Sequence, residues 1–468
     1  MLRSDERKMN SYPRHRGTNP ARDAGEESVL VYSAMKQLLF LLLALSPACA
    51  HAQSSASAER RHRAASAFHD GIVLLHASSL TDILPDGFHQ DPYFFYFTGL
   101  ENTVGALLAI DGGKAESWLF LPTNPPFRKS GLRPEIQPGA ANSGIEHVVD
   151  WAELDGFLGA HSSARLYYVE DQSRFADLPP TLLSSKAPEA PTWLQIILEK
   201  WPAVEPKESS KQLQALMEVQ SAEEIRALRS AANATSIALM AGIGAIHPEA
   251  SQRSVEAAVV QNCWEHGAHG GAFWPWAMSG ANAVFPHPFF SMVRYDHLDQ
   301  PMRAGDLVRL DVGCEWNHYG GDLGRTVPVS GHYDDAQREL WNIFVAAYKA
   351  SAKLLRAGIG TDQVFDAWRK ELASHREGAK SALAQHAIDL WSDRKNVPYW
   401  QIHATNLVAA FPSEPLREGV TVNYEPIASV DGQGFFLEDM YLITQDGAEL
   451  LTPGVPYFAD EIEAAMIE

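Results

Sequence analysis

The sequence predicts an α/β (α+β) protein of two domains, and three observations lead to this prediction. The chain has 468 residues, of which 46% are hydrophobic and 21% charged, which suffices for two cores and is too apolar for a disordered chain. Short apolar runs typical of strands alternate with amphipathic runs typical of helices. Residues 201–210 (WPAVEPKESS) combine two prolines with charges, as linkers do. We therefore expect a smaller N-terminal α/β domain before this linker and a larger domain after it.

The composition excludes several classes of function. The chain has 38 lysines and arginines against 58 aspartates and glutamates, a formal net charge of -20. Nucleic-acid binding needs a basic face, so we do not expect it. The three cysteines, Cys49, Cys263 and Cys314, form no CxxC pair and predict neither a zinc knuckle nor a disulfide-rich scaffold. We interpret Cys314, directly after a strand glycine, as a packed thiol. Any metal must therefore be bound by His, Asp and Glu.

An export signal precedes the folded part. From Met35 the chain reads MKQLLFLLLALSPACAHAQ, with a lysine, an apolar run and then small residues. Residues 35–52 are thus interpreted as a signal peptide with cleavage after Ala52. The apolar run is far shorter than the roughly 20 residues that span a bilayer, so we expect no stable membrane span. The polar, Arg-rich residues 1–34 are interpreted as a non-native upstream extension.

We therefore expect an exported protein, periplasmic or secreted. A lipoprotein is the alternative, because Cys49 follows Ala48, although Ser46 and Pro47 fit a lipobox poorly. Ser, Ala and Arg alternate over residues 53–64, which reads as a flexible leader.

The elements expected in the N-terminal domain are mostly strands. Apolar runs predict strands at 71–76, 106–110 and 117–121, and a helix at 192–200. The aromatic run 93–97 is interpreted as a further core strand.

Beyond the linker, helices come first. Ser221 and Glu224 fit a capping box ahead of a helix over 225–241, and a second helix is expected over 253–266. Strands follow Gly305, with further helices over 334–355 and 361–374.

Four apolar strands of the second domain each carry an acid where a core-facing or cleft-facing residue is expected. These acids are Asp311, Asp322, Glu425 and Glu438. A carboxylate in a half-buried strand costs several kcal/mol unless it is paired or binds a cation. Any one of them alone is explained equally well as a surface acid of an edge strand. Four acids together, with His403 in another apolar segment, favour shared metal coordination.

This set of side chains indicates hydrolytic chemistry. Oxygen ligands with a single imidazole suit Mn, Co, Zn or Fe(II). Four acids exceed what one divalent ion needs, whereas two ions about 3.5 to 4 Å apart, bridged by carboxylates and a hydroxide, would use them all. The sequence therefore predicts a metal-dependent hydrolase.

Five stretches resemble aminopeptidase P, the Xaa-Pro aminopeptidases among the pita-bread metallopeptidases of family M24. They are DPYFFYFTGL (91–100), SGANAVFPHP (279–288), GDLVRLDVGCEWNHYGGDLGRTVPVSG (305–331), VNYEPIA (422–428) and LEDMYLIT (437–444). The resemblance implies an N-terminal aminopeptidase P domain over 65–205 and a pita-bread catalytic domain with pseudo-twofold α/β halves over 211–468. It also implies a homo-oligomer, a dimer or tetramer.

The resemblance further implies a role for each site residue. The five metal-ligand positions are taken by Asp311, Asp322, His403, Glu425 and Glu438. Asp311 would hold one ion, His403 and Glu425 the other, while Asp322 and Glu438 bridge them. The ions are two divalent cations, with Mn the first candidate and Co or Zn the alternatives. A metal-bridging hydroxide would attack the scissile carbonyl, and Glu425 would pass a proton to the departing amine. His287 would steady the tetrahedral intermediate; otherwise it is an ordinary loop histidine between two prolines.

Three positions depart from the family. Where the family usually reads H-G-x-G-H, this chain reads YWQIH at 399–403. Ala410 stands where another cleft histidine is common, and Phe436 stands where an arginine is common. Tyr399 and Trp400 are therefore expected to shape an altered substrate-binding pocket. Proline specificity, which the family ties to the cleft histidines, stays open.

The predicted activity is hydrolysis of the N-terminal Xaa-Pro bond of peptide substrates by a metallo-aminopeptidase. Metal-free hydrolysis, as in creatinase-like enzymes, is one alternative, but those enzymes lack this ligand set. A pita-bread peptidase with non-prolyl or dipeptide substrates is the second, and a catalytically weak peptide-binding relative is the third. His266 and His269, three apart in EHGAHGG, are interpreted as loop residues rather than metal ligands.

Overall fold

The computed structural model describes residues 56–78, 83–84, 87–122, 143–169, 192–284, 301–396, 399–405, 407–408 and 411–467. Ser57–Glu468 form one compact unit. The predicted signal peptide and upstream extension lie outside the described residues. Within the described part of the chain, no helix is both long enough and apolar enough to cross a bilayer.

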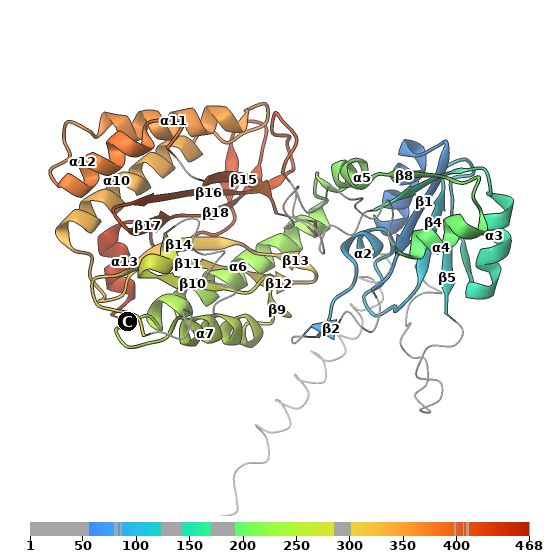
Figure 1. Cartoon of the computed structure of the whole chain (residues 1–468), viewed down its shortest axis with the longest axis horizontal. Coiled ribbons are helices and arrows are strands. Elements are labelled where there is room, and N and C mark those ends of the chain that lie inside the picture. The colour runs from blue at the N-terminus through green and yellow to red at the C-terminus, as the bar shows by residue number, and fades with distance from the viewer. Residues whose placement is uncertain are drawn as a thin grey trace, which may run out of the picture. The chain divides into compact units, whose positions relative to one another are not determined.

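The N-terminal part is built on a six-stranded mixed sheet (Figure 1) with the order β6-β5-β4-β1-β7-β8. The strands are β1 (Gly71–His76), β4 (Leu107–Asp111), β5 (Glu116–Leu121), β6 (His147–Asp150), β7 (Arg165–Tyr168) and β8 (Glu205–Glu208). Alternate residues of β1 enter two different cores, Val73 and Leu75 one, Ile72 and Leu74 the other. Because successive side chains of a strand point to opposite faces, both faces of this sheet are covered, which explains the uninterrupted apolar run.

Helices cover the two faces of this sheet. Helix α2 (Pro92–Thr98) contributes aromatic side chains to one core, and α3 (Leu154–Ala160) and α4 (Thr192–Lys200) contribute to the other. The prediction of a strand over 93–97 is therefore wrong. Asp91 caps the helix by accepting a hydrogen bond from the Phe94 N–H at 2.8 Å, and Pro92 occupies the first turn. Both are helix-start signals that the aromatic run obscures.

The expected flexible leader is also corrected. Residues 56–67 are helical, and two of their arginines are buried. Arg60 and Arg61 donate to the backbone carbonyls of Tyr96 and Phe97, at 3.0 and 2.9 Å, which are the last carbonyls of α2. Helix C-termini leave such carbonyls without internal partners, and cations there are stabilising. The predicted linker likewise contains β8, an exposed edge strand.

The C-terminal part has two main sheets, ordered β10-β11-β14 and β15-β16-β18-β19 with β17 paired to β16. The first contains β10 (Trp276–Ser279), β11 (Leu307–Val312) and β14 (Leu323–Pro328). The second contains β15 (Tyr399–Ala404), β16 (Thr421–Val430), β17 (Gln433–Phe436), β18 (Asp439–Ile443) and β19 (Ala448–Leu450). Most of their apolar residues enter one large core.

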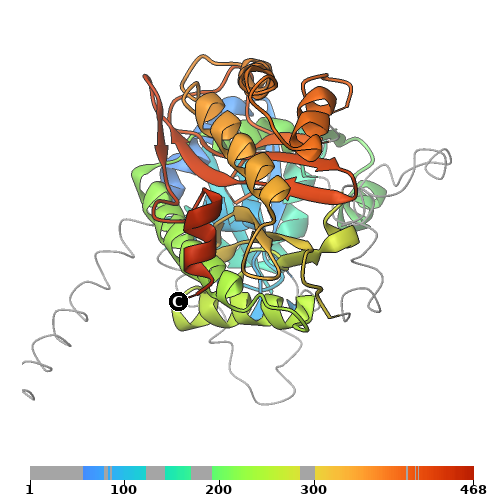
Figure 2. The same ribbon diagram turned by 90° about the vertical axis from the view of Figure 1, so that its left-hand side faces the viewer.

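Helices cover both sides of these sheets. Helices α6 (Ala222–Gly244) and α7 (Gln252–Glu265) lie on one side, and α10 (Asp335–Ala352), α11 (Thr361–Ser374) and α12 (Ala382–Trp391) lie on the other. Both views agree on this layering (Figure 1, Figure 2). The predicted helices over 225–241, 253–266, 334–355 and 361–374 are confirmed, and α6 begins with the expected capping box of Ser221 and Glu224. Two helix-covered antiparallel sheets form the pita-bread architecture that the resemblance implies.

Within the described residues, an isolated backbone bridge between Gly324 and Glu438 joins the two main sheets. The Gly324 N–H donates to the Glu438 carbonyl at 3.2 Å, and the Glu438 N–H donates to the Gly324 carbonyl at 3.0 Å. A Cβ atom at position 324 would lie 1.8 Å from the Phe436 ring. Only glycine therefore lets the two sheets approach this closely.

A disulfide joins Cys263, near the end of α7, to Cys314. Cys314 begins β12 (Cys314–Trp316), which pairs with β9 (Gly270–Gly271) and β13 (Tyr319–Gly320) in a small sheet. The interpretation of Cys314 as a packed thiol is therefore wrong. The two cysteines are 51 residues apart, so only the packing of α7 against β12 brings them together.

Candidate metal centre

The five predicted ligands lie on or beside strands of the two sheets, and three of them, Asp322, His403 and Glu438, are brought close together. Asp311 lies on β11 opposite Gly324 of β14, and Asp322 directly precedes β14. His403 on β15 faces Asn423, and Glu425 lies two residues further along β16. Glu438 lies between β17 and β18, at the backbone bridge to Gly324. The junction of the two sheets thus gathers residues that are far apart in the chain.

The imidazole of His403 lies among three carboxylates. Its Nε2 atom is 3.5 Å from Asp322 Oδ2, 3.5 Å from Glu438 Oε1 and 3.7 Å from Glu425 Oε1. The ligand atoms of Asp322, His403 and Glu438 all lie within 4.8 Å of one another. This is the spacing of side chains that share a cation.

Crowding raises the pKa of the acids. Burial, together with the nearby charge of Glu438, raises the pKa of Asp311 to about 7. Burial raises the pKa of Asp322 well above its ordinary value, and the charges of Glu438, Asp311 and Glu425 add to this. Burial opposes the charged form of His403, but the Glu438 carboxylate, the Ala404 carbonyl and the charge of Asp311 together raise the pKa of His403. The centre therefore concentrates negative charge that one imidazole does not balance.

Among the described residues, two buried oxygen atoms of this centre have no hydrogen-bond partner. Asp322 Oδ1 and Glu438 Oε2 are buried and accept no hydrogen bond from the part of the chain that the structure describes. A buried carboxylate oxygen without a donor is costly unless a cation binds it. Oxygen donors with one imidazole are the ligand set of Mn, Co, Zn or Fe(II). The residues therefore fit divalent metal ions.

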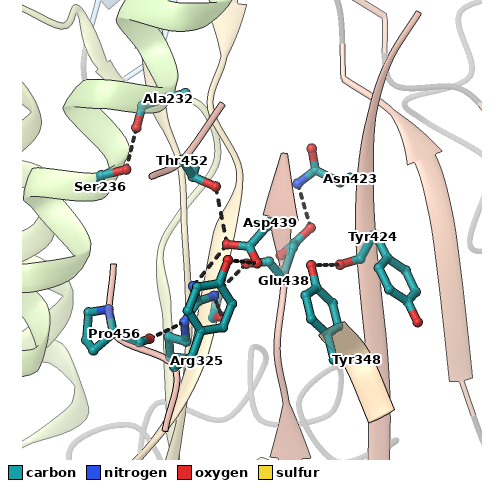
Figure 3. Close-up of polar contacts among 12 residues, drawn as sticks. Ala232, Ser236, Arg325, Tyr348, Asn423, Tyr424, Glu438, Asp439, Thr452 and Pro456 are labelled. Atoms are coloured by element: carbon teal, nitrogen blue, oxygen red, sulfur yellow. Dashed lines mark hydrogen bonds and ion pairs between the residues drawn. The ribbon is translucent and has the colours of Figure 1, made fainter. Parts of the chain in front are cut away.

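Neighbouring side chains hold Glu438 in place. Asn423 Nδ2 donates to Glu438 Oε1 at 2.7 Å and to the Asp322 carbonyl at 3.0 Å. The fully buried Arg325 donates through Nη1 to the Glu438 carbonyl at 2.8 Å and through Nη2 to Asp439 Oδ1 at 2.9 Å (Figure 3). The backbone and the side chain of Glu438 are thus each fixed by a separate donor, as metal ligands usually are.

Arg309 is a member of the centre that the sequence did not reveal. The residue is 3% exposed, and its Nη2 lies 2.8 Å from Asp311 Oδ2. Its guanidinium carbon lies 4.2 Å from the centre of the Phe436 ring. The family's arginine is absent at position 436, where this chain has phenylalanine. Arg309 of β11 stacks on that phenylalanine and supplies a guanidinium beside Asp311. The sequence did hold one signal for it: side chains alternate between the two faces of a strand, so Arg309 and Asp311 share a face.

Other predicted site residues are not tested by the structure. His287 and Ala410, and the side chains of Tyr399 and Trp400, lie outside the described residues. Their predicted roles near the substrate stay predictions. His266 is the cap residue that follows α7 and lies in a turn, as expected of a loop residue, with its Nδ1 2.9 Å from the Asn262 carbonyl.

Family models and sequence relatives both relate this chain to aminopeptidase P. Residues 226–445 match metallopeptidase family M24, and residues 57–167 match the aminopeptidase P N-terminal domain. An Xaa-Pro aminopeptidase of Haemophilus influenzae is 24% identical over 407 residues, covering 81% of this chain and 88% of the relative. The Xaa-Pro aminopeptidase of Escherichia coli is 28% identical over 268 residues, covering 53% of this chain and 59% of the relative.

A similar fold occurs among solved structures. Proline aminopeptidase P II from Yersinia pestis superimposes with a TM-score of 0.70 at 22% identity, covering 88% of this chain and 99% of that structure. The superposition includes both parts of the chain.

Metal-free protein should lose stability as the pH rises. Because the pKa of Asp311 is raised from 3.8 to about 7, the folded state binds a proton that the unfolded chain releases above about pH 4. The free energy of unfolding should therefore fall by a few kcal/mol between about pH 4 and 7, because each unit of the pKa shift corresponds to about 1.4 kcal/mol. Urea unfolding of EDTA-treated protein at pH 5 and pH 8 measures this. Asp311→Asn should show a smaller difference, and equal differences in both proteins would contradict the prediction.

Replacing Arg309 should weaken metal binding. Arg309→Met removes the donor that orients Asp311, and loss of such partners typically costs 10- to 100-fold in metal affinity. Arg309→Lys should keep only part of the wild-type metal affinity, because an ammonium lacks the planar face that stacks on Phe436. Competition of Mn²⁺ with a chelating dye measures the affinity, with Arg376→Met, from an exposed ion pair with Asp389, as the control. Unchanged or tighter binding by Arg309→Met would show that Arg309 only competes with the ion for Asp311.

Proposed function

Since the chain belongs to metallopeptidase family M24, we propose that it is a metal-dependent aminopeptidase that removes the N-terminal residue of peptides with proline second. The observation that carries the proposal is the convergence of Asp322, His403 and Glu438 with two further buried acids at the junction of the sheets. The names of the Haemophilus and Escherichia relatives support the preference for proline.

The centre would hold two divalent cations, with Mn the first candidate and Co or Zn the alternatives. Their ligands would be Asp311, Asp322, His403, Glu425 and Glu438. When bound, such ions polarise the scissile carbonyl and lower the pKa of water, so that water becomes the nucleophile at neutral pH. Hydrolysis of the first peptide bond would yield the free N-terminal residue and the shortened peptide.

The protein's own residues handle the proton. Hydrolysis forms a bond from the water oxygen to the carbonyl carbon and breaks the bond to the amide nitrogen, which must gain a proton to leave. Glu425 is 5% exposed and its Oε1 lies 3.7 Å from His403 Nε2, so its carboxylate can take the water proton and deliver it to the amine. Asn423 and Arg309 keep Glu438 and Asp311 oriented while this occurs. His287 remains the predicted group on the substrate side.

We also propose that the protein is exported. The support comes from the signal-like residues 35–52 and from the Cys263–Cys314 disulfide, because disulfides persist in oxidising compartments. Cleavage after Ala52 would remove Cys49, so that both remaining cysteines are in the disulfide.

Peptide hydrolysis tests the proposed activity. With added Mn²⁺, we expect release of the first residue from a peptide with proline second but not from a matched peptide with alanine second. Asp322→Asn should lose at least about 100-fold in activity, because a lost ligand costs more than a lost supporting partner. The control is Asp431→Asn, an exposed turn position paired with His386. Hydrolysis of both peptides would favour a peptidase with non-prolyl substrates. Metal binding without hydrolysis of either peptide would favour a peptide-binding relative.

Export can be tested on protein made in a bacterial host with its own N-terminal residues. The mature protein should begin at Gln53, and the denatured, unreduced chain should contain no free thiol, because both remaining cysteines are bonded. N-terminal sequencing and a thiol titration measure this. An acylated Cys49 in the membrane fraction would indicate the lipoprotein, and a cytoplasmic chain with free thiols would contradict export.

A further inference from the structure

The Cys263–Cys314 disulfide lies next to the stretch of chain that carries two of the predicted metal ligands. Asp311 belongs to β11, which ends at Val312, and β12 begins two residues later at Cys314. The chain then returns through β13 to the residue that directly precedes Asp322. The disulfide is therefore attached to the segment that connects these two ligands.

A tight hairpin folds this segment back on itself. Asn317 and His318 form the two-residue turn between β12 and β13, and both have positive φ, 49° and 68°. Positive φ at both positions of a turn matches the twist of hairpin strands, and asparagine tolerates it well. The turn brings Gly321 back to Cys314, where the Gly321 N–H donates to the Cys314 carbonyl at 2.8 Å. The two predicted ligands therefore lie at the open end of this hairpin.

Three different groups hold Cys314 in place. Its N–H donates to Thr235 Oγ1 of α6 at 2.9 Å, its carbonyl accepts the Gly321 N–H, and its sulfur is bonded to Cys263 of α7. Both cysteines are fully buried. Strand β12 lies beside both helices (Figure 1). The base of the hairpin is thus tied to two helices, and its tie to α7 is covalent.

The base of the hairpin is packed without free space. A Cβ atom at Gly313 would lie 2.2 Å from the Gly321 carbonyl oxygen, and one at Gly321 would lie 2.1 Å from Thr235 Oγ1. Close-packed segments of this kind transmit displacements to their neighbours. A movement of β12 relative to α7 is therefore passed on to the segments that carry Asp311 and Asp322.

The carboxylates of the metal centre need such a restraint. The ligand atoms of Asp322 and Glu438 lie within 4.8 Å of each other, and Asp311 is buried on the strand that pairs with β14. Like charges at this distance repel, so the carboxylates tend to separate while no cation is bound. A fold that holds the ligands in their binding geometry strengthens binding, because less freedom is lost when the ion arrives.

We propose that the Cys263–Cys314 disulfide positions Asp311 and Asp322 for the metal ions, so that the centre binds metal tightly only when the disulfide is formed. This inference rests on the proposed metal-dependent function and adds a redox condition to it. Forming the S–S bond oxidises two thiols, and a low-molecular-weight disulfide takes up their two electrons and two protons and becomes two thiols. The chain thus acquires its full metal affinity in an oxidising compartment.

The metal affinity of a variant without the disulfide tests the proposal. In the full-length chain with both Cys263→Ala and Cys314→Ala, the affinity for Mn²⁺ should fall about 10-fold, as on loss of a partner that orients a ligand. Competition with a chelating dye measures the affinity, and far-UV circular dichroism checks that the variant is folded. Unchanged affinity would overturn this proposal alone, because the centre would still bind metal. A disulfide-bonded wild type that binds no Mn²⁺ would overturn the proposed function as well.

The matched control is Val259→Ala. Val259 is buried on α7 one turn before Cys263, and its truncation leaves a cavity while the disulfide stays intact. This variant should melt at a lower temperature than the wild type and keep the wild-type affinity for Mn²⁺. An equal loss of affinity in Val259→Ala would show that metal binding follows the packing of α7 in general, and would also overturn the proposal.

A redox cycle on the wild type gives a second measurement that does not depend on how the double variant folds. A phosphine in mild urea, removed by gel filtration into buffer, opens the disulfide, and oxidised glutathione closes it again, with thiol titration after each step. Mn²⁺ affinity should fall about 10-fold on reduction and return on oxidation, whereas the double variant should show no change through the same cycle. A reduced wild type that keeps the affinity of the oxidised protein would overturn the proposal and leave the disulfide as a stabilising cross-link.

Discussion

The close backbone contact between Gly324 and Glu438 is the constraint on which the metal centre depends. It joins a strand of the first C-terminal sheet to the second sheet, and it leaves no room for a Cβ atom at position 324, because the Phe436 ring lies there. Asp322 lies two residues before Gly324, so the same contact brings the carboxylates of Asp322 and Glu438 close to each other and to His403.

Bringing these acids together opposes folding, and the surrounding residues offset only part of the cost. Arg309 pairs with Asp311, Asn423 donates to Glu438, and Arg325 holds the Glu438 backbone while its own charge is matched by Asp439. The raised pKa values of Asp311 and Asp322 reflect the electrostatic cost that these partners do not offset. Such a loss of stability is typical of sites whose negative charge is neutralised by a bound cation.

The pairing of Arg309 with Phe436 shows how a departure in one strand is matched in another. Judged along the sequence, a phenylalanine two residues before Glu438 looks like the loss of a supporting arginine. In three dimensions the guanidinium of Arg309 lies on that phenylalanine ring and contacts Asp311. Side chains on adjacent strands can exchange such roles because the site requires a charge at a point in space, whatever strand supplies it.

The sequence by itself determined the α/β class and the positions of four helices in the second domain, and it predicted five metal ligands, because hydrophobic periodicity and acids within apolar strands can be read locally. It misread residues 53–64 and 93–97, where a helix depends on partners far along the chain or its cap is masked by aromatic residues. Tertiary structure alone decided the Cys263–Cys314 pairing and the contact of Arg309 with Phe436. Each of these is a contact between residues distant in sequence, and no local pattern specifies which distant strands will meet.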